Sequence, residues 1–223
     1  MNTDTLSALL PTTLPVTLIV NAGGQSRRMG QPKALLPLPP TNRPLLETIV
    51  QRFQTLAPQQ TIVIANDPHF RHQVVLGENV RWLTDTYLNV GPLGGLATGL
   101  AACHGWAIFV ACDMPLLNPT LFAYFGRLAA ETDTTDCAQW DAVVPVVNGY
   151  PEVLHAFYHR RCLSAVQACL AAEKRRAVAF LPDVRVRYVA ETELRRFDPT
   201  LQSFFNANTP EEWAQAKALL LAR

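Results

Sequence analysis

Short apolar runs alternate along this chain with segments whose apolar residues recur at helical spacing, and this alternation restricts the fold more than any other feature. The first run, residues 16–20, is mostly β-branched and apolar, as expected for a strand buried on both faces. Further predicted strands are residues 61–65, 80–83, 106–111, 142–147 and 184–189. Predicted helices are residues 45–56, 68–76, 93–104 and 159–172, with two more that begin at Pro119 and Pro210. This order predicts an α/β fold with three layers, in which helices flank a mostly parallel, Rossmann-like central sheet.

Local signals mark several boundaries of these elements. Asn118, followed directly by a proline, is a typical helix N-cap. Thr209 and Glu212 have the spacing of a capping box at the start of the last helix. Pro145 interrupts a predicted strand, and because proline cannot donate to a strand ladder, it indicates an edge or a bulge there.

Length and composition indicate one domain without a membrane anchor. The chain has 223 residues, of which 49% are hydrophobic, so residues 14–223 are predicted to form a single domain. Residues 1–13 lack the basic start of a signal peptide and are predicted to be a flexible extension. No apolar run reaches the roughly 18 residues of a membrane span. A net charge of +1 gives no general attraction to nucleic acid or to an anionic membrane.

The cysteines indicate the compartment. The chain has five cysteines, without a Cys-x-x-Cys pair or the spacing of a disulfide framework. Most of them therefore read as small apolar core residues in a reducing compartment. We expect a cytoplasmic protein.

The segment 21–33, Asn-Ala-Gly-Gly-Gln-Ser-Arg-Arg-Met-Gly-Gln-Pro-Lys, follows the first predicted strand and has the properties of a polyphosphate site. Gly23 and Gly24 let the backbone come close to a ligand, and successive N–H groups can bind phosphate oxygens. Arg28 and Lys33 add positive charge, and no Asp or Glu occurs between Thr5 and Leu46. The spacing fits neither the Walker phosphate loop nor the Gly-x-Gly-x-x-Gly dinucleotide loop.

Four polar residues stand at or just after the ends of predicted strands: Asn21, Asn66, Asp85 and Asp113. In a parallel sheet, ligands bind beyond the carboxyl ends of the strands. We therefore expect these four side chains at one edge of the sheet, around a binding site.

The motifs along the chain resemble those of the nucleotidyltransferases that activate phosphorylated metabolites. Within that superfamily the chain is most similar to the molybdenum cofactor guanylyltransferases. The matching segments, in order, are 22–33, Gly-Pro-Leu-Gly-Gly-Leu at 91–96, Ala-Cys-Asp-Met-Pro at 111–115 and Phe-Asn-Ala-Asn-Thr-Pro-Glu-Glu at 205–212. One residue departs from the family pattern, because Asn21 stands where a leucine is usual before Ala-Gly-Gly.

The resemblance implies a nucleotidyltransferase fold and an enzyme that moves GMP from GTP to molybdenum-bearing molybdopterin, with release of pyrophosphate. Its implied cofactor is Mg²⁺, held by Asp113 at the end of a buried strand, since magnesium prefers one or two carboxylates and completes its shell with phosphate and water. The implied catalytic residues are Arg28, Lys33 and Asp113. The implied nucleotide contacts are Asn21, Ala22, Gly23, Gly24, Lys33, Asn66, Asp85 and Asp113.

The acceptor half of the site is expected in the second half of the chain, at His155, Arg175 and Arg176. GTP and molybdenum-molybdopterin are the implied substrates. Transient contacts with proteins that deliver molybdopterin, and with apo-molybdoenzymes, are the implied macromolecular interactions.

Three alternatives remain open at this point. Gly-Gln-Pro-Lys-Ala-Leu-Leu at 30–36 is very similar to the cytidylyltransferase relatives, which use CTP, whereas Ala22-Gly23-Gly24 resembles the guanylyl form. A sugar-phosphate or other metabolite-phosphate nucleotidyltransferase is the second alternative. The third is a non-catalytic, nucleotide-sensing accessory protein for molybdoenzymes.

Overall fold

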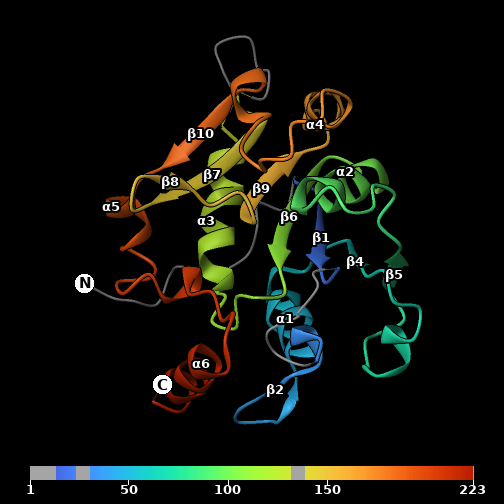
Figure 1. Ribbon diagram of the computed structural model, residues 1–223. Helices are drawn as coiled ribbons and strands as arrows, with labels where there is room; N and C mark the ends of the chain where they lie inside the picture. The colour runs from blue at the N-terminus through green and yellow to red at the C-terminus, as the bar shows by residue number, and fades with distance from the viewer. Residues whose placement is uncertain (1–13, 24–30, 132–138, 223) are drawn as a thin grey trace.

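A computed structural model describes residues 14–23, 31–131 and 139–222. Its central element is an eight-stranded sheet with the strand order β10-β7-β9-β6-β1-β4-β5, in which β8 pairs with β7 (Figure 1). The strands are β1 (Val16–Asn21), β4 (Gln60–Ile64), β5 (Val80–Leu83), β6 (Trp106–Ala111), β7 (Ala142–Val147), β8 (Tyr150–Pro151), β9 (His155–His159) and β10 (Val186–Val189). A small second sheet pairs β2 (Pro37–Leu38) with β3 (Arg43–Pro44).

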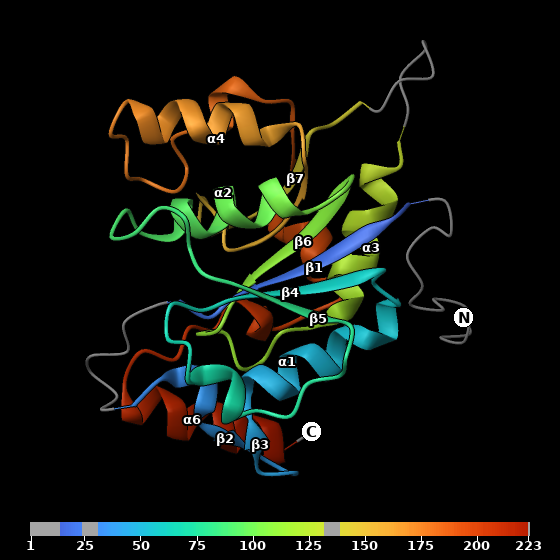
Figure 2. The ribbon, with the colours of Figure 1, turned by 90° about the vertical axis from the view of Figure 1, so that its right-hand side faces the viewer.

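Helices cover both faces of the large sheet, so the molecule has three layers (Figure 2). One face carries α1 (Leu45–Phe53), α3 (Pro119–Ala129) and α6 (Pro210–Leu221), and the other carries α2 (Pro92–Ala102) and α4 (Cys162–Ala171). The shorter helices are η1 (Lys33–Leu35), η2 (Gln54–Leu56), η3 (Phe70–His72), η4 (Leu181–Asp183), α5 (Glu191–Leu194) and η5 (Gln202–Phe204). The three-layer α/β prediction is confirmed.

Strand β6 shows why a continuous apolar run forms the centre of this sheet. Ile108 and Val110 pack into the core on one face, and Ala107 and Phe109 pack into the core on the other. All four side chains have 0% exposure. A strand that is buried on both faces has no need of alternating polar residues.

The sheet is parallel over β5-β4-β1-β6 and again between β10 and β7, whereas β9 runs antiparallel to both of its neighbours. The carboxyl ends of β1, β4, β5 and β6 therefore meet at one edge. Strand β9 begins, rather than ends, at that edge because its first residue His155 pairs with Val110 near the end of β6.

Several local predictions hold. The Asn118 side chain accepts a hydrogen bond from the Thr120 N–H (3.0 Å), as an N-cap does. Thr209 Oγ1 accepts from the Glu212 N–H (3.2 Å), and Glu212 Oε2 accepts from the Thr209 N–H (2.9 Å), which completes the capping box. Four of the five cysteines are buried and free: Cys103, Cys112, Cys162 and Cys169.

Pro145 lies at a bulge, as its missing N–H indicates. Residues 142–143 of β7 pair with β9 and residues 146–147 pair with β8, so residues 144–145 face the longer segment 152–156. Segment 152–156 therefore bulges away from β7 beside Pro145. Proline has no N–H to donate to a strand ladder, so within sheets it occurs at edges and bulges.

Two predictions about secondary structure are wrong. Residues 68–76 form only the single turn η3 and not a helix. Phe70 and Val74 are buried, but Val75 between them and the next strand is 86% exposed, so the segment has no continuous buried face. The helix predicted from residue 159 begins later, at Cys162, because His159 belongs to β9.

The flexible extension predicted for residues 1–13 lies outside the described residues, and the single domain over 14–223 stays a prediction. In the part of the chain that the structure describes, no helix has the length and apolar character needed to cross a membrane.

Candidate functional site

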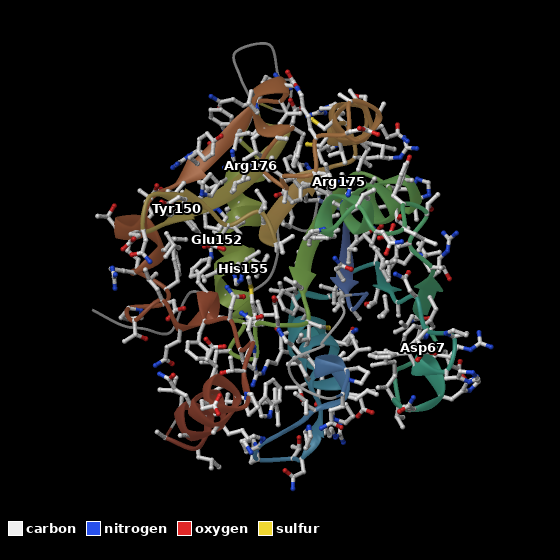
Figure 3. The ribbon with its side chains drawn as sticks, in the orientation of Figure 1. Asp67, Tyr150, Glu152, His155, Arg175 and Arg176 are labelled. Carbon is white, nitrogen blue, oxygen red and sulfur yellow. The ribbon has the colours of Figure 1, made fainter. Side chains whose placement is uncertain are left out.

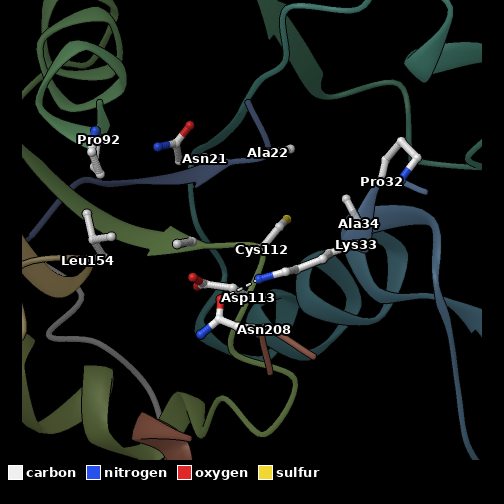
Figure 4. A pocket seen from close by; sticks show the side chains of 11 residues that line it. Asn21, Ala22, Pro32, Lys33, Ala34, Pro92, Cys112, Asp113, Leu154 and Asn208 are labelled. Atoms are coloured by element: carbon white, nitrogen blue, oxygen red, sulfur yellow. Dashed lines mark hydrogen bonds between the residues drawn. The ribbon is translucent and has the colours of Figure 1, made fainter. Parts of the chain in front are cut away.

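A pocket of about 270 Å³ lies at the carboxyl ends of β1 and β6 (Figure 4). It is lined by Asn21, Ala22, Pro32, Lys33, Ala34, Pro92, Ala111, Cys112, Asp113, Leu154 and Asn208. The pocket therefore brings together four of the residues expected to bind nucleotide: Asn21, Ala22, Lys33 and Asp113. This is the edge at which parallel sheets bind their ligands.

Lys33 is fixed in this pocket by a residue from the far end of the chain. Its Nζ donates to Asn208 Oδ1 at 2.6 Å (Figure 4). Asn208 is itself held by the last helix, since its N–H donates to Glu212 Oε2 at 2.6 Å. The capping box of α6 thus places an amide oxygen against the lysine ammonium.

Asp113 follows β6 and lies beside the Lys33–Asn208 pair. Its carbonyl oxygen accepts the Ala207 N–H (2.8 Å), which joins the end of β6 to the segment before α6. Its carboxylate Oδ1 is buried and has no hydrogen-bond partner among the described residues. Burial raises the pKa of Asp113, although the Lys33 ammonium acts in the opposite direction. The pocket therefore holds a carboxylate oxygen that is ready to accept a ligand.

Residues after β1 form the wall next to the first turn of α2. The Asn21 Oδ1 accepts the Gly23 N–H at 3.4 Å. A Cβ added at Gly95 would lie only 2.8 Å from Asn21 Nδ2, so a glycine is required where α2 meets this side chain. Asn21, which departs from the family pattern, therefore packs between the glycine loop and the helix.

Asn66 and Asp85, after β4 and β5, are linked to each other. Asn66 Oδ1 accepts the Asp85 N–H at 3.0 Å. Asp85 Oδ1 accepts both the Tyr87 N–H and the Thr98 hydroxyl at 2.9 Å, so this oxygen holds the loop to α2. A Cβ added at Gly23 would lie 3.6 Å from Asn66 Nδ2, which places Asn66 beside the glycine loop. Contacts of Asn66 and Asp85 with guanine stay predictions.

Gly24 and Arg28 lie outside the described residues, so their expected roles stay predictions. The structure separates the three residues expected on the acceptor side (Figure 3). Arg175 and Arg176 are exposed and follow the end of α4. Neither arginine is among the residues that line the pocket.

His155 is buried completely, and this burial contradicts a direct contact with an acceptor in this structure. Its ring stacks on Phe122 at 4.7 Å between centroids and packs against Phe204 at 4.4 Å. Its Nδ1 lies 3.4 Å from Met114 Sδ, next to Asp113 in the chain. Burial lowers the pKa of His155 to about 3, so the ring is neutral at physiological pH. The physical reason is that His155 opens a central strand, where side chains point into the core.

Two further residues line the pocket: Asn208, to which the sequence assigned no role, and Leu154, from the segment expected near the acceptor. The Asn208 motif is visible in the sequence, but its contact with Lys33 spans 175 positions and has no local signature. Leu154 lines the wall because its carbonyl accepts the Ala111 N–H (3.2 Å) and so extends the pairing of β9 with β6.

Taken together, the parallel sheet and a pocket at its carboxyl edge with a lysine beside a carboxylate are typical of α/β proteins that bind phosphorylated ligands. A family model described as the MobA-like NTP transferase domain matches residues 18–186. This chain belongs to that family, and it is a nucleotidyltransferase.

Individual relatives extend the match over almost the whole chain. A protein of Methanothermobacter thermautotrophicus described as a "probable molybdenum cofactor guanylyltransferase" is 34% identical over 202 residues, which cover 88% of this chain and 96% of the relative. A protein of Pelotomaculum thermopropionicum with the same description is 32% identical, over 92% of this chain and 94% of the relative.

The solved structures agree with the sequence relatives. The molybdopterin-guanine dinucleotide biosynthesis protein A of Archaeoglobus fulgidus has a TM-score of 0.74 and 25% identity, over 93% of this chain and all (100%) of that one. A 4-diphosphocytidyl-2C-methyl-D-erythritol synthase from Anaerococcus prevotii, at 14% identity and a TM-score of 0.62, shares the fold.

Proposed function

We propose that this protein transfers GMP from GTP to molybdenum-bearing molybdopterin, which forms molybdopterin guanine dinucleotide and releases pyrophosphate. The observation that carries the proposal is the pocket in which Lys33 lies against Asp113 and Asn208, in a chain that matches guanylyltransferase relatives over nearly its full length. The names of these relatives favour GTP over CTP. They do not favour transfer to a sugar phosphate or a purely sensing role.

The chemistry asked of this pocket is electrostatic. An acceptor phosphate oxygen attacks the α-phosphorus of GTP, a new P–O bond forms, and the bond to the β-phosphate oxygen breaks as pyrophosphate leaves. The acceptor phosphate is already ionised near neutral pH, so no protein base has to remove a proton. Lys33 places a positive charge where negative charge develops on the leaving group, and binding of both substrates supplies orientation.

The donor atoms in the pocket fit a hard divalent cation, which we propose to be Mg²⁺. Asp113 offers a buried carboxylate oxygen without a partner among the described residues, and Asn208 offers an amide oxygen. Magnesium binds one or two such groups and takes its remaining oxygens from phosphates and water. The cation would neutralise triphosphate charge when bound.

The acceptor would approach from the side of β9 and α4, where Arg175 and Arg176 are exposed. We further propose that transient contacts with molybdopterin-delivering proteins and with apo-molybdoenzymes bring substrate in and take product away.

Binding and turnover of the purified protein test the proposal. Calorimetric titration should show that GTP with Mg²⁺ binds more tightly than CTP, ATP or UTP. Pyrophosphate release should require both GTP and molybdopterin. Equal or tighter binding of CTP would replace the guanylyl assignment by the cytidylyl one, and nucleotide binding without pyrophosphate release would favour a sensor.

A further inference from the structure

Glu152 lies in the bulge between β8 and β9, at the same edge of the sheet as the pocket (Figure 3). Two hydrogen bonds fix the backbone of Glu152 in this bulge. The Glu152 N–H donates to the Pro145 carbonyl (2.8 Å), and the Glu152 carbonyl accepts the His155 N–H (3.1 Å). The side chain is half-buried, so its carboxylate is neither a core residue nor a fully solvated one.

Glu152 lies close to Asp113 in the fold. The Ala111 N–H donates to the Leu154 carbonyl (3.2 Å), where β6 ends and β9 begins. Asp113 follows this hydrogen bond by two residues and Glu152 precedes it by two residues. Burial and then the negative charge of Asp113 raise the pKa of Glu152, so the two carboxylates are close enough to interact.

This juxtaposition is unfavourable without a ligand. Two carboxylates that are close together and partly removed from water repel each other. Asp113 has the Lys33 ammonium nearby, and Asp85 accepts two hydrogen bonds through Oδ1. The Glu152 carboxylate, by contrast, accepts no hydrogen bond and forms no ion pair with the residues that the structure describes. Its two oxygens remain available for hydrogen-bond donors from a ligand.

The strand order indicates which substrate those donors belong to. Asn21, Asn66 and Asp85 follow β1, β4 and β5, on one side of β6. Glu152 precedes β9, on the other side of β6. With the reacting phosphates beside Asp113 at the end of β6, the nucleotide occupies the first side and the acceptor extends over the second.

We propose that Glu152 binds the acceptor by accepting hydrogen bonds from the ring N–H and the amino group of its 2-amino-4-oxo-pyrimidine edge. The inference rests on the proposed function, which supplies a pterin as the acceptor. A carboxylate matches two neighbouring parallel N–H donors, as it does in bidentate pairs with arginine. A site built to accept from such donors discriminates against a ring that lacks one of them, because a buried acceptor is then left unpaired.

The test uses pterin and lumazine as inhibitors that compete with molybdopterin in the pyrophosphate assay. Lumazine carries an oxygen in place of the 2-amino group of pterin. The variants are Glu152→Gln, which keeps the shape, and Glu78→Gln as a matched control on an exposed loop. We expect wild type and Glu78→Gln to prefer pterin by about tenfold or more, and Glu152→Gln to lose most of that preference. The KM for molybdopterin should rise about 10- to 100-fold in Glu152→Gln, with little change in kcat or GTP affinity.

Three results would overturn the inference. The first is an unchanged preference for pterin over lumazine in Glu152→Gln, or no such preference in wild type. The second is a raised Mg²⁺ requirement with the preference intact, which would make Glu152 part of the metal site. The third is weaker binding of GTP with a reduced preference for GTP over ITP, which would place Glu152 on the nucleotide side. GMP transfer by wild type is measured separately, so failure of the proposed function is not confused with failure of this inference.

Discussion

Replacement of Asp113 by asparagine is expected to remove most turnover and yet to stabilise the ligand-free protein. Its carboxylate Oδ1 is buried without a partner among the described residues, and burial raises its pKa in spite of the charge on Lys33. The surroundings therefore stabilise the charged form of this side chain less than water does. Asparagine keeps the shape without the charge, and it also removes the repulsion from Glu152.

The two effects differ in size. Leaving a buried acceptor without a hydrogen bond costs about 1–3 kcal/mol, and more when the acceptor is charged. Part of that cost is already offset by Lys33, so Asp113→Asn should gain about 1 kcal/mol in the free energy of unfolding. For a protein of this length, such a gain raises Tm by roughly 2–4 °C. A bound cation contributes several kcal/mol to the transition state, so turnover should fall by at least about 100-fold.

Thermal unfolding with a chelator present measures the first effect, and pyrophosphate release at saturating Mg²⁺ measures the second. Asp183→Asn, at an exposed aspartate, is the matched control and should alter neither quantity. Addition of Mg²⁺ and GTP should raise the Tm of wild type and of the control more than that of Asp113→Asn, because ligand binding stabilises only the state that binds. Near-normal turnover in Asp113→Asn would refute the reasoning, and so would a Tm several degrees below wild type without ligands.

Three further predictions follow from the same contacts. Lys33→Ala should weaken GTP binding about 10- to 100-fold and leave guanosine binding unchanged in calorimetry, because one charge-assisted phosphate contact is lost; equal weakening of both would mean that Lys33 only shapes the loop. Replacement of Arg175 and Arg176 together by alanine should raise the KM for molybdopterin and leave GTP affinity unchanged; the opposite pattern would assign them to the nucleotide side. His155→Leu should reduce the acid sensitivity of the fold. The folded pKa of His155, about 3, lies below its ordinary value of 6.5, so the unfolded chain takes up a proton that the folded chain does not as pH falls from 6.5 towards 3, and wild type loses stability over that range. Urea unfolding at about pH 7 and about pH 4.5 measures this loss, and an equal loss in both proteins would contradict it.

The parallel part of the fold is predictable because its signals are local. Residues 106–111 form an apolar run that is buried on both faces, and such a run identifies a central strand by itself. The caps at Asn118 and Thr209 depend on side chains within three residues of one another. Each of these elements is fixed by its own sequence before any tertiary contact is known.

The segment at 68–76 shows where local pattern fails. Phe70 and Val74 have helical spacing, but tertiary contacts fix the backbone around them in another way. Asp67 Oδ1 accepts the His69 N–H (2.8 Å), which forms a turn, and the Val75 N–H donates to Glu47 Oε1 (2.7 Å) on α1. A hydrogen bond to a residue 28 positions away cannot be read from a periodicity.

In the site, too, the residues with a local sequence signal are predictable and those that depend on tertiary contacts are not. Lys33 and Asp113 lie in the pocket at the edge of the sheet where the sequence pattern predicted a binding site, because an aspartate after a buried strand stands at that edge. Their roles toward phosphate and metal stay predictions. Asn208 is not found in this way, since its role depends on reaching Lys33 from the other end of the chain. The strand that contains His155 was not predicted from the sequence, and neither was the burial of this side chain in the core.

The antiparallel strand β9 explains why the acceptor half was the harder one to predict. In a parallel sheet, polar residues that follow strands gather at one edge, so a search for such residues finds Asn66, Asp85 and Asp113. Strand β9 runs the other way, and the residues that it brings to this edge therefore precede it, as Glu152 and Leu154 do. Strand β9 thus supplies the pocket wall with Leu154, a residue that precedes the strand instead of following it. The same reversal brings the Glu152 carboxylate close to Asp113, on the side of β6 away from the strands that Asn21, Asn66 and Asp85 follow.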